Sequence, residues 1–164
     1  MAKPTPAGRT GFAISLKGRA LRLLAGREHS RFELERKLAA HAPTLEQLAQ
    51  VLDELQAKDF ISETRVVASV INRRQVRLGT SRIRRELQDK GIDAEKVAHA
   101  MAGLKATELE RAREVWRKKF NSKTDAGTSP DDKARQMRFL AARGFSGDTI
   151  RKVVLNSESD QNVL

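Results

Sequence analysis

The chain has 164 residues, a formal net charge of +11 and a pI near 10.5, and 39% of its residues are hydrophobic. It contains no cysteine, which excludes disulfide and thiolate chemistry. No stretch approaches the roughly 20 apolar residues of a membrane span, and the first residues lack the apolar segment of a signal peptide, so we expect a cytoplasmic protein without a membrane partner. The excess of positive charge predicts a polyanionic partner, either nucleic acid or a nucleoprotein.

The first half of the chain shows the signals of four helices. Residues 1–12 hold two prolines and two glycines, and we predict that they are disordered. Gly26 can end a first helix, capping boxes begin at Ser30 and Thr44, and Ser62 can start a fourth helix. The predicted helices span about 15–25, 30 to the boundary at Pro43, 44–57, and 62 to near Gly79.

Five more helices are predicted in the second half. Aliphatic residues recur there at helical spacing, without a convincing strand. Ser129 followed by Pro130 is a strong helix start, because proline fits the first helical position. The predicted segments span about 81–90, 93–103, 107–120, 129–144 and 146–155, with a loop near 121–129 and a flexible tail at 157–164. About nine helices and no strand indicate an all-α fold.

The nine helices fall into three triplets with a common pattern. One leucine marks the same place in each triplet, and the positions ten and fourteen residues further on are apolar in all three. The three reference leucines are Leu38, Leu87 and Leu140. Chance alignment of amphipathic helices is the alternative explanation. We predict three-helix repeats at 13–60, 61–105 and 106–156, stacked into an elongated, curved body.

A column of arginines accompanies these leucines, two positions before each one. Because two residues turn a helix by about 200°, these side chains should point away from the core. The column consists of Arg36, Arg85 and Arg138. A second column, three positions after each leucine, holds His41, Lys90 and Arg143. Cations there also favour the helix dipole, so both a structural and a binding role stay open for the second column.

The most basic stretch is Asn72–Lys90, which Gly79 and the two residues after it divide between two helices. We predict that its arginines bind a polyanion, with Arg77 converging on the exposed Arg82 and Arg85. The binding candidates in this stretch are Arg73, Arg77, Arg82, Arg84 and Arg85. Arg74 falls on the apolar stripe, so it either extends its charge to solvent or pairs with an acid such as Glu86.

A second basic run, residues 111–123, contains the candidates Lys118 and Lys119. Trp116 and Phe120 are one helical turn apart there and either stack on bases or, as such pairs more often do, form core. No phosphate loop, nucleophile elbow or paired carboxylates appear, and the three histidines stand far apart. We therefore expect no catalytic site, no cofactor and no metal.

Several segments resemble the RecX family. They are the triplet repeat itself, Arg74–Leu87 (R-x-x-x-x-G-T-S-R-I-R-x-E-L), Leu87–Ile92 (L-x-x-K-G-I), Arg27–Leu38 and Phe60–Glu63. The resemblance covers about residues 15–155 and is most specific in the second repeat, whereas the third repeat diverges more from the family pattern.

The resemblance implies a bacterial regulator that binds the RecA recombinase, mainly its filament on DNA. Members inhibit strand exchange and ATP hydrolysis in DNA repair and the SOS response, bind single- or double-stranded DNA more weakly, and are not known as enzymes. We expect a monomer. One alternative is a helical-repeat protein that binds DNA or RNA independently of a recombinase, and another is a scaffold for acidic proteins.

Overall fold

The computed structural model describes residues 13–120 and 129–156, which form eight α-helices and one 3-10 helix with no strand. The all-α fold is therefore confirmed. The predictions for residues 1–12, 121–128 and 157–164 lie outside the described residues.

The first of two compact units extends to Ile61 and contains three α-helices. Ser30 and Glu33 form the predicted capping box, because the Ser30 hydroxyl accepts from the Glu33 amide at 3.1 Å and the Glu33 carboxylate accepts from the Ser30 amide at 3.0 Å. The helices enclose one apolar core around the buried Leu34, Leu38 and Leu52. The elements are α1 (Leu16–Gly26), α2 (Arg31–Leu38), the 3-10 helix η1 (Ala39–His41) and α3 (Leu45–Ala57).

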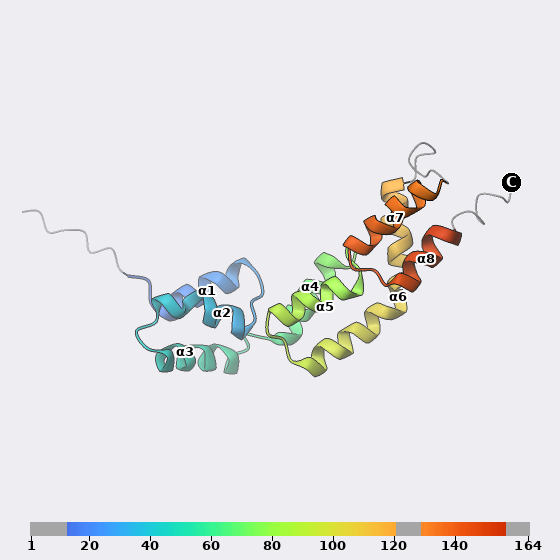
Figure 1. Cartoon of the computed structure of the whole chain (residues 1–164). Helices are drawn as coiled ribbons and strands as arrows, with labels where there is room; N and C mark the ends of the chain where they lie inside the picture. Colours follow the sequence, from blue (N-terminus) through green and yellow to red (C-terminus); the bar gives the residue numbers. More distant parts are fainter. Residues whose placement is uncertain (1–12, 121–128, 157–164) are drawn as a thin grey trace, which may run out of the picture. The chain divides into compact units, whose positions relative to one another are not determined.

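The second unit begins at Ser62 and is organised along one long helix, α6. In Figure 1, α4 and α5 pack along the first part of α6, and α7 and α8 pack along its last part. The elements are α4 (Glu63–Arg74), α5 (Thr80–Asp89), α6 (Ala94–Phe120), α7 (Pro130–Ala142) and α8 (Gly147–Asn156).

The continuity of α6 corrects the prediction of separate helices at 93–103 and 107–120. Nothing between Leu104 and Thr107 is a helix breaker, and a single Gly103 costs a helix only about 1 kcal/mol. Buried side chains recur on both sides of the predicted break, so packing favours one helix of 27 residues. The predicted boundary between the second and third repeats, at 105 and 106, therefore lies inside a helix.

Two predicted helix ends also differ from the structure. The fourth helix ends at Arg74 rather than near Gly79, and the second ends as α-helix at Leu38 before the 3-10 turn. Two carbonyls of residues 75–78 accept from the Arg111 guanidinium instead of from a following helical turn, at 3.4 Å for Gln75 and 2.7 Å for Leu78. A long-range partner of this kind is not visible in local sequence.

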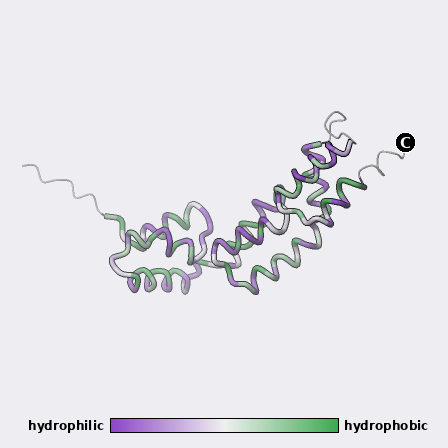
Figure 2. The backbone as a smooth tube through the Cα atoms, in the orientation of Figure 1, coloured by the Kyte–Doolittle hydropathy of each residue, from purple (hydrophilic) through white to green (hydrophobic). Residues whose placement is uncertain are grey.

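Three apolar cores follow the three copies of the repeat. Hydrophobic and hydrophilic residues alternate along the helices in Figure 2. Leu38, Leu87 and Leu140 are each at most 2% exposed and lie in three different cores. The α6 helix contributes Met101 to one core and Val115 to another. The equivalence of the three leucines, inferred from spacing alone, is thus matched by their burial.

A close backbone contact joins the start of α5 to the turn between α7 and α8. The Gly79 amide donates to the Arg143 oxygen at 2.8 Å, and the Ser81 amide donates to the Gly144 oxygen at 3.2 Å. Gly144 has a φ of +85°, and a Cβ on Gly79 would come within 2.3 Å of the Gly144 carbonyl carbon. Only glycine allows this approach.

Candidate polyanion-binding surface

The predicted binding residues divide into two groups by what they contact. Arg73, Arg74, Arg82 and Arg36 each have a contact within the protein. The others are exposed, and none makes a hydrogen bond or ion pair with any residue that the structure describes. This second group, the free cations, consists of Arg77, Arg84, Arg85, Lys118, Lys119 and Arg138. A cation without an internal partner keeps its full charge for a ligand.

Arg74 forms the ion pair with Glu86 that the sequence suggested. Its Nε donates to the carboxylate at 2.7 Å and its Nη2 at 3.4 Å, which links the end of α4 to α5. Arg73 donates from Nε to the Ser69 oxygen at 3.3 Å. Arg36 lies over the Phe32 ring at 5.6 Å from its centroid. These contacts are local and leave the Arg36 and Arg73 side chains exposed.

Arg82 is exposed, as predicted, but it is also a structural residue. Its Nε and Nη2 donate to the Ala142 oxygen at 3.1 and 2.9 Å, at the end of α7. The bond supports the same junction as Gly79 and Gly144. Replacing Arg82 would therefore also disturb the fold, while a shared binding role for Arg77, Arg82 and Arg85 stays a prediction.

The arginine column points outward as predicted. Arg36, Arg85 and Arg138 are all exposed. The second column is mixed, because Arg143 is partly buried and its guanidinium carbon lies over the Phe139 ring, 3.6 Å from the centroid. That stacking fixes the guanidinium against the surface.

A surface hollow of about 330 Å³, which we call the cationic hollow, is lined by four cations: Arg77, Lys118, Lys119 and Arg143. It brings Arg77, from the turn before α5, beside Lys118 and Lys119 of α6, and no carboxylate of residues 13–120 or 129–156 lines it. Val76, 55% exposed, supplies apolar surface next to the charges. The lining residues are Val76, Arg77, Val115, Lys118, Lys119, Phe139 and Arg143.

The hollow joins two stretches that the sequence left as separate candidates. Arg77 belongs to the most basic stretch, and Lys118 and Lys119 belong to the second basic run. Like charges brought together without a counter-charge repel one another, and a bound anion relieves that repulsion. The arrangement therefore suits a polyanion such as a phosphate backbone.

The aromatic pair of the second basic run belongs to the core. Phe120 is 3% exposed and packs edge-on against Phe139, with 5.1 Å between ring centroids. The Trp116 indole nitrogen donates to the Gln136 side chain at 2.9 Å. Because Phe120 is buried and Trp116 is partly buried and hydrogen-bonded, the pair is not a stacking platform for bases.

A buried polar junction in the second unit was missed by sequence reasoning. Glu108, 7% exposed, accepts from the Thr80 amide at 3.1 Å and from the Ser146 and Thr149 hydroxyls at 2.8 and 2.9 Å. Arg111, counted in the second basic run, is not surface charge, because its guanidinium donates to the Thr80 hydroxyl and to backbone carbonyls. The available signal was position, since Glu108 falls in line with the buried Leu104 and Ala112 on α6.

Burial alone would raise the pKa of Glu108, but the hydrogen bonds from Ser146, Thr80 and Thr149 outweigh it and lower the pKa. Burial lowers the pKa of Arg111, and the neighbouring Glu108 charge opposes that effect. Glu108 therefore stays ionised as a structural group, holding two helix starts together.

The described part of the chain contains no cluster of three or more His, Cys, Asp or Glu residues suited to a metal. His29 is 2% exposed; its Nδ1 lies 3.0 Å from the Arg27 oxygen, and its Nε2 has no hydrogen-bond partner in the described structure. No helix among residues 13–120 and 129–156 combines the length and apolarity that crossing a membrane requires.

The fold and the surface define an all-helical protein with three apolar cores and a cationic hollow on its second unit. The sequence profiles described as "RecX, first three-helix domain" and "RecX, third three-helix domain" match residues 17–60 and 106–154. The chain belongs to the RecX family of regulatory proteins. It is 54% identical to Regulatory protein RecX of Leptothrix cholodnii, with 86% of this chain and 88% of that protein covered. It is 44% identical to Regulatory protein RecX of Herminiimonas arsenicoxydans, with 91% and 97% covered.

The crystal structure of RecX from Lactobacillus salivarius has the same fold. The TM-score is 0.73 at 20% sequence identity, and the match covers 88% of this chain and 95% of that one. A second crystal structure, of regulatory protein RecX, gives a TM-score of 0.68 at 20% identity, with 86% and 71% covered.

Proposed function

We propose that this protein binds the RecA recombinase, mainly the RecA–DNA filament, and inhibits its recombinase and ATPase activities in DNA repair and the SOS response. It acts in the cytoplasm as a regulator and not as an enzyme. Family membership supports a regulatory role, since the relatives at 54% and 44% identity bear the name Regulatory protein RecX. RecA and DNA as partners follow from the family resemblance.

The observation that carries the proposal is the cationic hollow. Arg77, Lys118 and Lys119 converge there, and the described residues that line the hollow include no acid. A filament on DNA presents phosphates and acidic protein surface together, so one basic body can contact both. Counterion release from the DNA would supply much of the affinity and make it sensitive to salt.

The test compares binding to a preformed RecA–single-strand filament with binding to naked single-stranded DNA and to RecA alone. The filament should be bound most tightly, and RecA's DNA-dependent ATP hydrolysis should fall as the protein is added. Equal affinity for naked and RecA-coated strands would instead favour a nucleic-acid-binding protein that acts without a recombinase.

Charge reversal tests whether the hollow is the contact. Lys118→Glu with Lys119→Glu should weaken filament binding by about tenfold or more, because attractions to phosphate become repulsions. The matched control is Arg22→Glu with Lys152→Glu, which makes the same charge change at exposed cations outside the hollow. If both double variants lose the same affinity, the effect comes from net charge, and the hollow is not the contact.

A further inference from the structure

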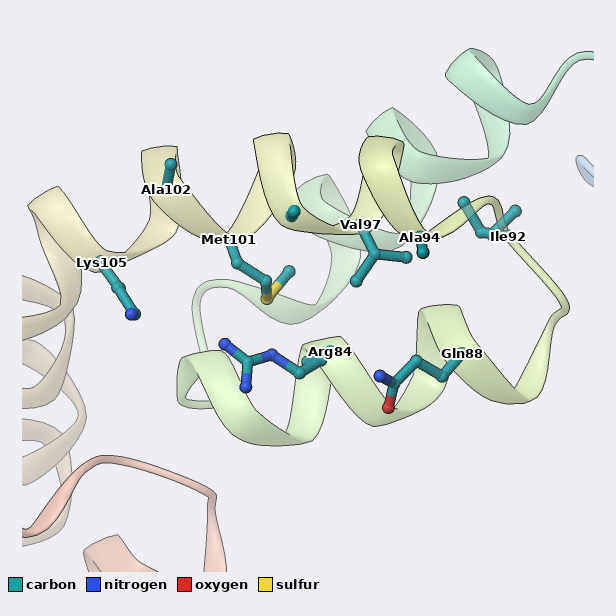
Figure 3. Close-up of a pocket in the computed structure, with 9 residues that line it drawn as sticks. Arg84, Gln88, Ile92, Ala94, Val97, Met101, Ala102 and Lys105 are labelled. Atoms are coloured by element: carbon teal, nitrogen blue, oxygen red, sulfur yellow. The ribbon is translucent and has the colours of Figure 1, made fainter.

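A groove distinct from the cationic hollow runs between α5 and the first half of α6 (Figure 3). Its volume is about 550 Å³. Ile92, Val97 and Met101 form an apolar floor, and each of them is also part of the core of the second repeat. In Figure 3, Met101 and Val97 extend from α6 toward α5, the helix that carries Arg84 and Gln88. We call this site the α5–α6 groove.

The charges of the α5–α6 groove have one sign. Arg84 and Lys105 are its only charged lining residues, and neither makes an ion pair or hydrogen bond with any part of the chain that the structure describes. A second apolar groove, between α4 and α6, differs because Asp93 and Glu95 line it together with Lys96. The α5–α6 groove thus combines an apolar floor with positive charge that no described residue pairs, whereas the α4–α6 groove carries carboxylates of its own.

The lining favours a protein segment over nucleic acid. None of the residues that line the groove is aromatic, so no ring is available to stack on a base. Three alanines, Ala94, Ala98 and Ala102, stand one helical turn apart along the exposed side of α6. Such small side chains let the backbone of a second helix approach closely, at the 8–10 Å axis separation of packed helices.

We infer that the α5–α6 groove docks an acidic amphipathic helix of a protein partner. The apolar face of that helix lies on Val97 and Met101, and its carboxylates pair with Arg84 and Lys105. Desolvated charge pairs at the rim of an apolar contact add specificity against basic or neutral segments. The identity of the partner rests on the proposed function, under which the helix belongs to the recombinase, while DNA occupies the cationic hollow.

The first test needs no recombinase. A fluorescent designed helix with leucines on one face and glutamates on the other is titrated with the full chain, alongside a counterpart with lysines in place of the glutamates. The acidic peptide should bind at least about tenfold more tightly than the basic one. Ala98→Arg should weaken its binding by about tenfold, because arginine fills the groove and keeps a high helix propensity, although it adds one positive charge. Ala68→Arg, the same change in the α4–α6 groove, is the control.

Equal binding of the acidic peptide to the Ala98→Arg and Ala68→Arg variants would overturn the inference, as would preference for the basic peptide. These outcomes do not bear on the proposed function, because RecA is absent.

The second test uses the RecA–single-strand filament. Arg84→Glu with Lys105→Glu should weaken filament binding about tenfold more than Arg22→Glu with Lys152→Glu, while both double variants bind naked single-stranded DNA alike. If the groove variant loses naked-strand affinity as strongly as filament affinity, the occupant is nucleic acid and the inference is wrong. If the wild-type chain fails to bind the filament at all, the proposed function fails, and the peptide titration still decides the groove.

Discussion

Gly79 and Gly144 determine how closely α5 approaches the turn before α8. A Cβ at Gly79 would meet backbone atoms of Gly144 and Phe145 at 2.3 Å, and a Cβ at Gly144 would meet the Arg82 amide nitrogen at 2.7 Å. Backbone cannot move aside cheaply, so Gly79→Ala should destabilise the protein by more than about 2 kcal/mol. Urea unfolding followed by circular dichroism measures the loss.

Gly103 provides the control for that prediction. A Cβ there meets nothing within 4 Å, and the residue lies inside α6. Gly103→Ala should therefore stabilise the protein by about 0.5–1 kcal/mol, because alanine loses less backbone entropy in a helix. Equal stability of the Gly79→Ala and wild-type proteins would show that the junction is not as tight as the structure has it.

His29 should make the first unit sensitive to mild acid. Burial lowers the pKa of His29 from its ordinary value of 6.5; the bond to the Arg27 carbonyl opposes the shift, and the Arg27 charge adds to it. Protonation would place a charge and an unpaired Nε2–H in the core. The unfolded chain thus takes up the proton first, so stability is full above about pH 6.5 and declines as the pH falls below it.

The measurement is the urea midpoint of the first unit between pH 7.5 and about 5, above the range in which ordinary carboxylates titrate. His29→Gln should flatten the dependence, since an amide does not titrate there. His41→Gln, at an exposed histidine, should leave it in place. A midpoint that stays constant across this range in the wild-type protein would contradict the prediction.

At the level of residues, the sequence predicted whether a side chain faces solvent better than it predicted which group that side chain contacts. Helical geometry alone was enough to place Arg85 and Arg138 on the surface, and the Arg74–Glu86 pair followed from proximity of charge along the chain. The roles of Arg82 and Arg111 depend on carbonyls 60 and 33 residues away, which spacing does not reveal. Their guanidiniums resembled surface charge because nothing local identified the acceptors.

At the scale of helices, the buried carboxylate of Glu108 matters most, because it accepts hydrogen bonds at the starts of two helices. Gly79, the N-cap of α5, has no side chain to bond the first helical amides, and Glu108 accepts from the Thr80 amide in its place. Its other oxygen accepts from Ser146 and Thr149 at the start of α8. The negative charge also favours both helix dipoles.

Glu108→Gln should destabilise the second unit by about 1.5–3 kcal/mol. The change removes hydrogen bonds to a charged carboxylate, and it places the glutamine NH2 group against groups that now donate to Glu108. The lowered pKa of Glu108 means that its contribution is present above its ordinary value of 4.5 and is lost as the pH falls through the lower folded value. The variant should therefore lose less stability than wild type below about pH 4.5. Thermal unfolding at pH 7 and pH 3.5 measures both effects.

Glu110→Gln is the control on the same helix. Its side chain is 70% exposed and pairs only with Arg113 at 2.7 Å, so the change should stay within about 0.5 kcal/mol. If Glu108→Gln were as mild as this control, the buried junction would not hold α5 and α8 together.

The helices themselves were largely predictable, because caps and apolar spacing are local. Ser30, Thr44, Ser62 and Ser129 all begin helices as predicted. The missed feature was the union of two predicted helices in α6. The repeat pattern favoured a break near 105, whereas the chain there lacks any residue that would end a helix. The absence of a helix-ending residue therefore decided the structure here, and the repeat pattern did not.

At the scale of the whole molecule, four of the free cations lie in two chemically different sites: Arg77, Lys118 and Lys119 in the cationic hollow, and Arg84 in the α5–α6 groove. Repeat spacing predicted a basic face but could not show that Arg77 meets Lys118 and Lys119, because that meeting depends on the packing of α4 against α6. It also could not separate Arg84, which borders an apolar groove, from the other arginines of α5. The sequence gives the net charge of the protein, but it does not show which cations lie in the hollow and which lie in the groove.

Salt dependence should separate the two sites in filament binding. Each lost phosphate contact removes roughly 0.7–0.9 from the slope of log affinity against log salt, so Lys118→Glu with Lys119→Glu should flatten that slope by about 1.4–1.8. Ala98→Arg, which blocks the α5–α6 groove without removing a cation, should lower affinity at every salt concentration and leave the slope unchanged. Because the two sites share no lining residue, the free-energy losses should add within about 0.5 kcal/mol in the combined variant. Anisotropy titrations of filaments on labelled DNA across a salt series give all three slopes. A flattened slope for Ala98→Arg would mean that DNA occupies the groove, and strong non-additivity would mean that both changes affect one contact.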